Sequence, residues 1–162
     1  MNFPTVSGAT LSGREFTIPY GLEGEYNLVM ISFEPAQQFL LRTWLPFLAQ
    51  MGEQYESFRY YELPTLGNLN EDQRMFIDQG MRRSINDPAI WDIVITLYLD
   101  KNTFRKVLDM RGESTIYLFL IDHEGVILWR SEGIATQLKK DDLTRTLQKI
   151  YDIDNTTLWE VD

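Results

Sequence analysis

The sequence predicts an α/β protein whose central mixed β-sheet is covered by helices on both faces. Three observations lead to this prediction. The stretch from Arg111 to Gly133 holds two apolar runs joined by a turn, which is typical of a β-hairpin. Before it, three short apolar segments alternate with helical patterns, as in parallel strands joined by crossover helices. After it comes one amphipathic helical pattern, which would close the domain.

The first third of the chain supplies the edge and the centre of the predicted sheet. Residues 10–18 alternate around a Ser-Gly pair and predict an N-terminal hairpin or edge strand. Residues 27–33 are almost wholly apolar, which favours a central strand covered on both faces. A helix is expected over residues 37–51, and Pro46 should kink or divide it because proline lacks the backbone donor.

The middle of the chain predicts two more strands and one helix. A second strand is expected over residues 57–63, ended by Pro64. A helix over residues 70–83 is opened by an arrangement like a capping box, in which Asn70 precedes Gln73 by three positions. Alternating apolar residues over 91–99 predict the third strand.

The last third supplies the hairpin and the closing helix. Asn102 or Thr103 is expected to cap a short helix. The hairpin strands are expected over residues 115–121 and 126–130, and the last helix over residues 139–151.

The length suits one domain. At 162 residues the chain can bury roughly two-thirds of the surface that its unfolded form would expose, and 44% of its residues are hydrophobic. No linker divides it, so we expect a single domain over residues 1–151 and an acidic C-terminal tail over residues 152–162. Trp159 in that tail could fold back onto the domain or contact a partner.

The charge balance excludes some partners. The formal net charge is −9, from 15 basic and 24 acidic residues, which argues against binding to nucleic acid or to anionic membranes. No apolar run approaches the roughly 18 residues of a membrane span, so stable membrane insertion is not expected. The first twenty residues lack the apolar stretch of a signal peptide and the arginine-rich pattern of a transit peptide, and we expect a soluble, cytoplasmic protein.

The absence of cysteine excludes whole classes of chemistry. Disulfides, thiolate nucleophiles, CxxC redox pairs and thiolate metal sites are impossible in this chain. His123 is the only histidine, and we interpret it as a solvent-exposed turn residue because its acidic neighbours in a tight turn diverge. No nucleophile elbow and no phosphate-binding glycine loop is present, so no metal and no cofactor is expected.

Three spacings make the chain resemble the thioredoxin superfamily in its redoxin branch. Counting back from Pro46, the kinking proline of that family, places Gln38-Phe39-Leu40-Leu41 where the family has CxxC. The words Arg111-Gly112-Glu113-Ser114-Thr115 match the setting of the family's cis-proline, with Ser114 in its place. The hairpin has the strand, Asp, x, x, Gly, strand pattern of the family. The resemblance implies a thioredoxin-like fold with an N-terminal hairpin.

The same resemblance implies that the family's thiol chemistry is lost, because both chemical positions are replaced. Thiol-disulfide oxidoreductase and peroxiredoxin activity are therefore excluded. Residues 126–135 are also similar to mitochondrial ATP-synthase assembly factors that carry a thioredoxin-like domain. This weaker similarity implies an assembly or chaperone role. Thioredoxin-like domains bind peptides by main-chain pairing at the segment before the hairpin, which needs no cysteine.

A candidate site follows from the expected fold. Open α/β sheets place ligands beyond the carboxyl ends of their strands, where Glu34 lies. We expect a crevice there formed by five residues, which are Glu34, Gln38, Leu41, Ser114 and Thr115. Two alternatives remain for this crevice, which are that packing fills it and that it is open as a groove for a peptide.

Two functions remain open at this point. The first is a redox-inactive thioredoxin-like domain that binds a protein partner, as an assembly or chaperone factor. The alternative is a non-thiol enzyme or a small-ligand-binding protein that uses the crevice around Glu34, Gln38 and Ser114. The Glu113-Ser114 peptide bond is expected to be trans, because a non-proline cis bond costs about 2.5–4 kcal/mol. The oligomeric state is not predicted.

Overall fold

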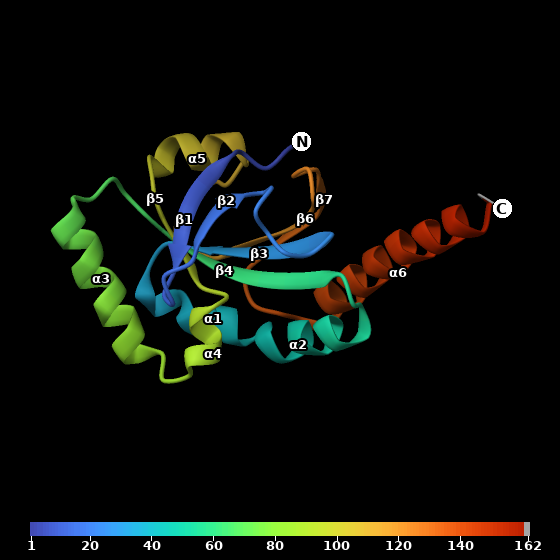
Figure 1. Ribbon diagram of the computed structural model, residues 1–162, viewed down its shortest axis with the longest axis horizontal. Coiled ribbons are helices and arrows are strands. Elements are labelled where there is room, and N and C mark those ends of the chain that lie inside the picture. The colour runs from blue at the N-terminus through green and yellow to red at the C-terminus, as the bar shows by residue number, and fades with distance from the viewer. Residues whose placement is uncertain (161–162) are drawn as a thin grey trace.

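The computed structural model of the protein describes residues 1–160, and of residues 154–160 it describes the backbone only. It contains one sheet of seven strands (Figure 1). The strands are β1 (Val6–Thr10), β2 (Glu15–Ile18), β3 (Tyr26–Ser32), β4 (Phe58–Leu66), β5 (Ile95–Tyr98), β6 (Tyr117–Asp122) and β7 (Ile127–Glu132).

The sheet is mixed, as the sequence predicts. Its order is β2-β1-β5-β4-β3-β6-β7. The strands β3, β4 and β5 are parallel to one another, β6 pairs antiparallel with β3, and β7 pairs antiparallel with β6. The N-terminal hairpin of β1 and β2 is also confirmed, and it extends the other edge of the sheet by pairing antiparallel with β5.

The helices cover both faces of this sheet. They are the 3₁₀ turn η1 (Pro35–Gln37), α1 (Gln38–Arg42), α2 (Leu45–Gln54), α3 (Glu71–Ser84), α4 (Pro88–Trp91), α5 (Lys101–Val107) and α6 (Gln137–Glu160). Figure 1 shows α5 on one side of the sheet, and α1, α2 and α6 on the other. Within residues 1–160, no helix combines the length and the apolar character that crossing a membrane would require.

Alternation along the central strands builds two hydrophobic cores. In β3, Val29 and Ile31 belong to the core under α5, whereas Leu28 and Met30 belong to the core under α1, α2 and α6. Because successive side chains of a strand point to opposite faces, a strand covered on both sides must be apolar throughout. This explains why the predicted central strand has no polar face.

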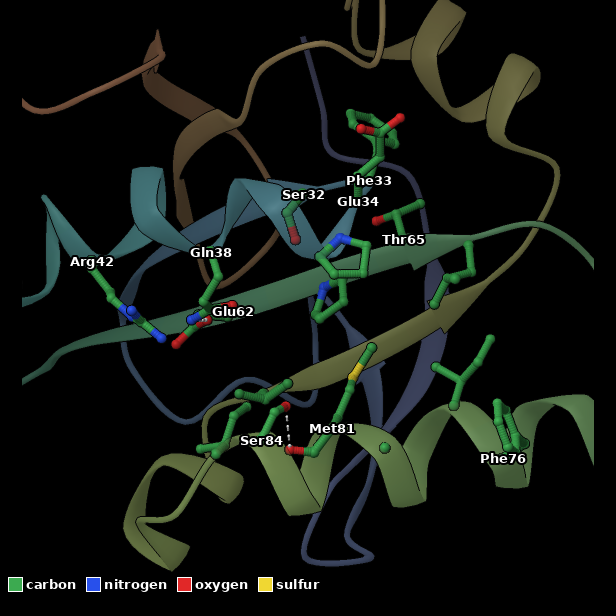
Figure 2. A pocket seen from close by; sticks show the side chains of 17 residues that line it. Ser32, Phe33, Glu34, Gln38, Arg42, Glu62, Thr65, Phe76, Met81 and Ser84 are labelled. Carbon is green, nitrogen blue, oxygen red and sulfur yellow. Dashed lines mark hydrogen bonds between the residues drawn. The ribbon is translucent and has the colours of Figure 1, made fainter.

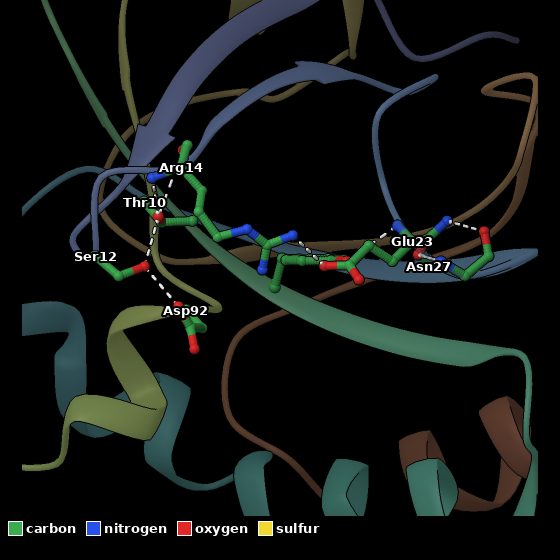
Figure 3. Close-up of polar contacts among 8 residues, drawn as sticks. Thr10, Ser12, Arg14, Glu23, Asn27 and Asp92 are labelled. Carbon is green, nitrogen blue, oxygen red and sulfur yellow. Dashed lines mark hydrogen bonds and ion pairs between the residues drawn. The ribbon is translucent and has the colours of Figure 1, made fainter.

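Polar contacts attach the N-terminal hairpin to its surroundings (Figure 3). The hydroxyl of Ser12 in the hairpin turn donates a hydrogen bond to Asp92 Oδ1, and the guanidinium of Arg14 lies 2.8 Å from Glu23 Oε1. Buried Asn27 holds the loop before β3, since its side chain accepts from Gly24 N and donates to Gly24 O, each at 2.9 Å.

Pro46 divides the first long helix, as predicted. The chain passes from η1 into α1 and breaks between Arg42 and Leu45, and Pro46 is the second residue of α2. Proline is tolerated in the first turn of a helix, where its missing N–H would have no partner within the helix.

The second strand does not end at Pro64, so that prediction is wrong. β4 continues to Leu66, and Pro64 pairs in register with Ser32 of β3. The backbone N–H of Glu62 donates to Ile93 on the β5 side, and N–H groups of a strand alternate in direction. The N–H that Pro64 lacks would therefore point toward β5. The pairing of β4 with β5 is interrupted at this place, between the Glu62–Val94 bridge and Thr65.

Two boundaries in the middle of the chain also differ from the prediction. The third strand begins at Ile95 instead of residue 91, because Asp87 caps Ala89 N and Pro88 starts the short helix α4. Helix α5 is capped by Asp100, whose side chain accepts from Thr103 N, and not by Asn102 or Thr103. At α4 the helix started by the cap takes Trp91 from the expected strand, and at α5 an aspartate two positions before Asn102 is the cap.

The last helix is longer than predicted. It runs from Gln137 to Glu160, so its backbone continues through most of the expected tail at residues 152–162. The division of the chain into a domain and a tail at residue 151 stays a prediction. The side chain of Trp159 lies outside the described part of the structure.

Candidate functional site

A pocket of about 500 Å³ opens at the carboxyl ends of β3 and β4. The segment from Ser32 to Pro35 and the first turn of α1 form one wall, and β4 forms the floor. The opposite wall is α3, whose residues Phe76, Met81 and Ser84 are seen in Figure 2. The pocket lies where open α/β sheets place their ligands.

The structure brings together two of the five predicted site residues. Glu34 and Gln38 both line the pocket, since β3 ends just before Glu34 and Gln38 is the first residue of α1. Leu41 is fully buried in the core under α1, α2 and α6. Ser114 and Thr115 lie in the loop before β6 and do not line the pocket. The five residues therefore do not form one crevice.

Gln37 joins the end of β3 to the loop before β6, and sequence reasoning missed this role. Its side chain is buried, with 5% of its surface exposed. Its Oε1 accepts from Phe33 N at 2.8 Å, and its Nε2 donates to Glu113 O at 2.7 Å. A weak signal was present, because Pro35 followed two positions later by Gln is typical of a helix start.

Glu62 is a second residue that sequence reasoning missed. It sits on β4 in the pocket floor with 1% of its surface exposed, and its Oε1 accepts from Gln38 Nε2 at 3.3 Å. Its other oxygen, Oε2, has no hydrogen-bond partner among the described residues. A signal existed in the sequence, because a carboxylate inside a strand of aromatic and apolar residues needs an explanation.

Burial sets the electrostatics of this carboxyl group. Loss of water raises the pKa of Glu62 above its usual value, while the Gln38 hydrogen bond and the positive charge of Arg42 act in the opposite direction with smaller effect. Figure 2 shows the side chains of Arg42, Gln38 and Glu62 gathered at one end of the pocket. A carboxyl in a pocket whose pKa is raised by burial is a candidate for a functional group.

The loop before β6 offers a different kind of surface. Ser114 is exposed and Thr115 is half-buried, and neither makes a hydrogen bond to the rest of residues 1–160 through main chain or hydroxyl. Glu113 anchors the loop, since its Oε1 lies 2.8 Å from Lys101 Nζ and its Oε2 lies 3.2 Å from Arg105 Nε, the latter without hydrogen-bond geometry. The peptide bond between Glu113 and Ser114 is trans, as expected.

In the turn between β6 and β7, backbone N–H groups already use the carboxylate of Asp122. Asp122 Oδ1 accepts from Glu124 N at 3.0 Å and from Val126 N at 2.9 Å, and Gly125 has a φ of +91°. His123 is exposed in this turn. Among the described residues, no group of three or more His, Cys, Asp or Glu side chains is placed to hold a metal ion.

Comparison with solved structures identifies the fold. No family model matches the chain, and no curated protein matches it either. The exposed lipoprotein thioredoxin of Streptococcus pneumoniae strain TIGR4 is similar with a TM-score of 0.58 at 12% identity, over 90% of this chain and 99% of that one. The thioredoxin domain of a thiol-disulfide oxidoreductase from Bacteroides vulgatus has a TM-score of 0.53 at 22% identity, over 93% and 95%.

A third neighbour, a thiol:disulfide interchange protein from Bacteroides sp., has a TM-score of 0.55 at 22% identity over 91% of this chain and 86% of that one. The fold is therefore thioredoxin-like, as the sequence resemblance implied. At these identities the likeness concerns the fold alone. The thiol chemistry named for two of these neighbours has no counterpart here, because this chain contains no cysteine.

Proposed function

We propose that this protein is a redox-inactive thioredoxin-fold protein that binds an extended segment of a protein partner at Ser114 and Thr115, in an assembly or chaperone role. The observation that carries the proposal is the unpaired main chain of these two residues, held at the surface beside the sheet. Backbone N–H and C=O groups without partners are what an incoming strand needs for main-chain pairing.

The loop is held in place before any partner arrives. Gln37 fixes the carbonyl of Glu113 from one side, and the ion pairs of Glu113 with Lys101 and Arg105 fix it from the other. A segment that is already ordered loses little conformational entropy on binding, so more of the interaction energy appears as affinity. This support is consistent with a binding role that needs no catalytic group.

The alternative function, an enzyme that combines Glu34, Gln38 and Ser114, has less support. Only the first two of these residues line the pocket. A catalytic group must come within hydrogen-bond reach of the reacting atoms, which requires the groups to converge. Ser114 does not share the pocket with the carboxylate and the amide.

The proposal is tested by affinity capture from the source cells with three tagged forms of the protein. Wild type and His123→Arg should recover the same partner, whereas Ser114→Arg should not, because arginine at position 114 obstructs pairing along the loop. His123→Arg is the matched control, since it adds the same charge at an exposed turn.

Hydrogen exchange then locates the contact. With the recovered partner bound, one of the two amides, Ser114 or Thr115, should exchange at least about tenfold more slowly, because successive N–H groups of an extended segment point to opposite sides and only one of them faces the added strand. Capture that is equal for Ser114→Arg and wild type, or unchanged exchange at both amides, contradicts the proposal.

A further inference from the structure

The pocket under α3 contains a polar atom that the protein itself leaves without a partner. Glu62 is 1% exposed, and its Oε2 has no hydrogen-bond partner among the described residues, although Oε1 is engaged by Gln38 at 3.3 Å. A buried polar group without a partner is costly, and native proteins rarely tolerate one that serves no purpose. Glu62 lines the pocket, so its carboxyl group lies beside a ligand bound there.

We propose that this pocket binds a neutral, largely apolar small molecule that carries a hydroxyl group, and that the carboxyl of Glu62 forms the hydrogen bond to this hydroxyl. The inference goes beyond the binding of a protein partner at Ser114, which uses a different surface, and it does not depend on it.

The walls of the pocket account for the apolar part of the ligand. Apart from the polar end, the lining is largely hydrocarbon and thioether, contributed by Pro64, Leu66, Ile77, Met81, Ile85 and Val94. Ligand pockets of this size are usually lined by apolar side chains with a few polar groups that fix orientation. The volume of about 500 Å³ lies within the usual range for small-molecule sites.

The polar end selects a neutral group. A ligand carboxylate would meet the carboxyl of Glu62, and a ligand ammonium would meet the positive charge of Arg42 at the same end. Each charged ligand group would therefore face one like and one opposite charge, so that attraction and repulsion oppose each other while the cost of losing its water remains. A neutral group avoids both costs.

Among neutral groups, a hydroxyl fits both protonation states of the carboxyl. An ionised Glu62 can only accept a hydrogen bond, and a protonated one can donate from the oxygen that Gln38 does not occupy. A hydroxyl donates in the first case and accepts in the second. Burial raises the pKa of Glu62, and a hydroxyl can pair with the carboxyl on either side of that pKa.

The helix that forms the outer wall leaves room for the ligand. No residue of α3 is buried, and a Cβ built on Gly80, which lines the pocket, meets no atom within 4 Å. Position 80 therefore has room for a Cβ without displacing its neighbours. Gly80→Leu is the variant chosen to place a larger side chain at the pocket.

The test uses three probes with the same eight-carbon chain, which are 1-octanol, octylammonium and octanoate. Binding is followed by amide chemical shifts of the full protein, at Gly80 and Met81 in the pocket wall and at Ser114 outside it. We expect 1-octanol to shift the pocket amides and to bind at least about tenfold more tightly than either charged probe, a difference of about 1.4 kcal/mol.

Four variants separate the hydrogen bond from the apolar contacts. Glu62→Met should weaken 1-octanol binding about tenfold, because the hydroxyl loses its buried partner. Glu62→Gln keeps a donor and an acceptor and should retain binding within about threefold. Gly80→Leu should abolish binding, and Gln79→Leu, which adds the same side chain next to the pocket, should leave it unchanged.

Three results would overturn the inference. They are an absence of pocket shifts with 1-octanol in wild type, equal affinity for all three probes, and wild-type affinity in Glu62→Met. Since Ser114→Arg leaves the pocket intact, that variant should bind 1-octanol as wild type does, so the two proposals fail or succeed separately.

Discussion

The side-chain amide of Gln37 donates a hydrogen bond of 2.7 Å to the backbone carbonyl oxygen of Glu113, 76 positions away in the chain. The same side chain accepts from Phe33 N, so one buried glutamine joins the end of β3 to the loop before β6. These are the two regions from which the sequence predicted a common crevice. Gln37 holds them together through these two hydrogen bonds.

Replacing Gln37 by methionine tests this role. Gln37→Met keeps the shape but leaves Phe33 N and Glu113 O without their partner, and we expect a loss of about 1–3 kcal/mol in the free energy of unfolding. Urea denaturation measures it as a lower midpoint at an unchanged m-value. The control is Gln79→Met on the exposed face of α3, expected within about 0.5 kcal/mol of wild type. Equal stability of the two variants would contradict the role of Gln37.

Glu62 should make stability depend on pH. Burial raises its pKa in the folded state above the usual value near 4.5, so between these two values the folded protein binds more protons than the unfolded chain. The contribution of Glu62 to stability is therefore fully present below the unfolded pKa and is lost as pH rises through the folded pKa. Glu62→Gln does not titrate and should gain stability relative to wild type as the pH rises from the unfolded value near 4.5 through the raised folded pKa.

Urea denaturation of both proteins at several pH values measures this difference. The control is Ser84→Ala, which changes the pocket without changing a titratable group. Its stability relative to wild type should be constant over the same pH range. If the stability difference between Glu62→Gln and wild type is also constant with pH, the pKa of Glu62 is not raised in the folded state.

Trp44 should be a main support of the core under α1, α2 and α6. It is fully buried, its Nε1 donates to Gly133 O at 2.9 Å, and its ring meets Trp129 edge to face at 6.2 Å between centroids. Trp44→Phe removes this donor and should lower the free energy of unfolding by about 1–3 kcal/mol. Thermal and urea denaturation measure the loss. Phe39→Leu, at a side chain 61% exposed, should change little, and an equal effect of the two would be unexpected.

Gly125 should tolerate no side chain. Its φ is +91°, and a Cβ built on it lies 2.7 Å from Pro19 Cγ. Gly125→Ala should therefore cost more than about 1 kcal/mol, because strain and a steric clash act together. Gly112→Ala is the control, since a Cβ there meets no atom within 4 Å. Calorimetric midpoints of both variants check this prediction, and a stable Gly125→Ala would show that the turn can rearrange.

Most of the fold could be predicted from local signals. The apolar run of β3, the capping residues Asn70 and Gln73 and the turn ending in Gly125 each act over a few neighbouring residues. The errors arose where two signals competed. At residues 91–94 the cap of Asp87 prevailed over the apolar alternation, and at Pro64 strand pairing with β3 prevailed over the usual effect of proline.

The candidate site was less accessible to sequence reasoning. Glu34 and Gln38 could be placed because they follow directly from the end of a strand. Leu41 was misplaced in the expected crevice because its helix turns it into the core, where it is fully buried. Glu62 and Gln37 gave little sign of their roles, since burial of a polar side chain depends on elements distant in the sequence.

The sequence by itself determined the fold class, through apolar periodicity, caps and turns, and it excluded thiol chemistry, because no cysteine is present. Only the tertiary structure decided which polar groups are buried, which are paired and which face a cavity. Those properties arise from contacts between β4, α1, α3 and the loop before β6. Long-range packing sets the local dielectric and the supply of hydrogen-bond partners, so it also sets the chemistry of Glu62 and the availability of Ser114.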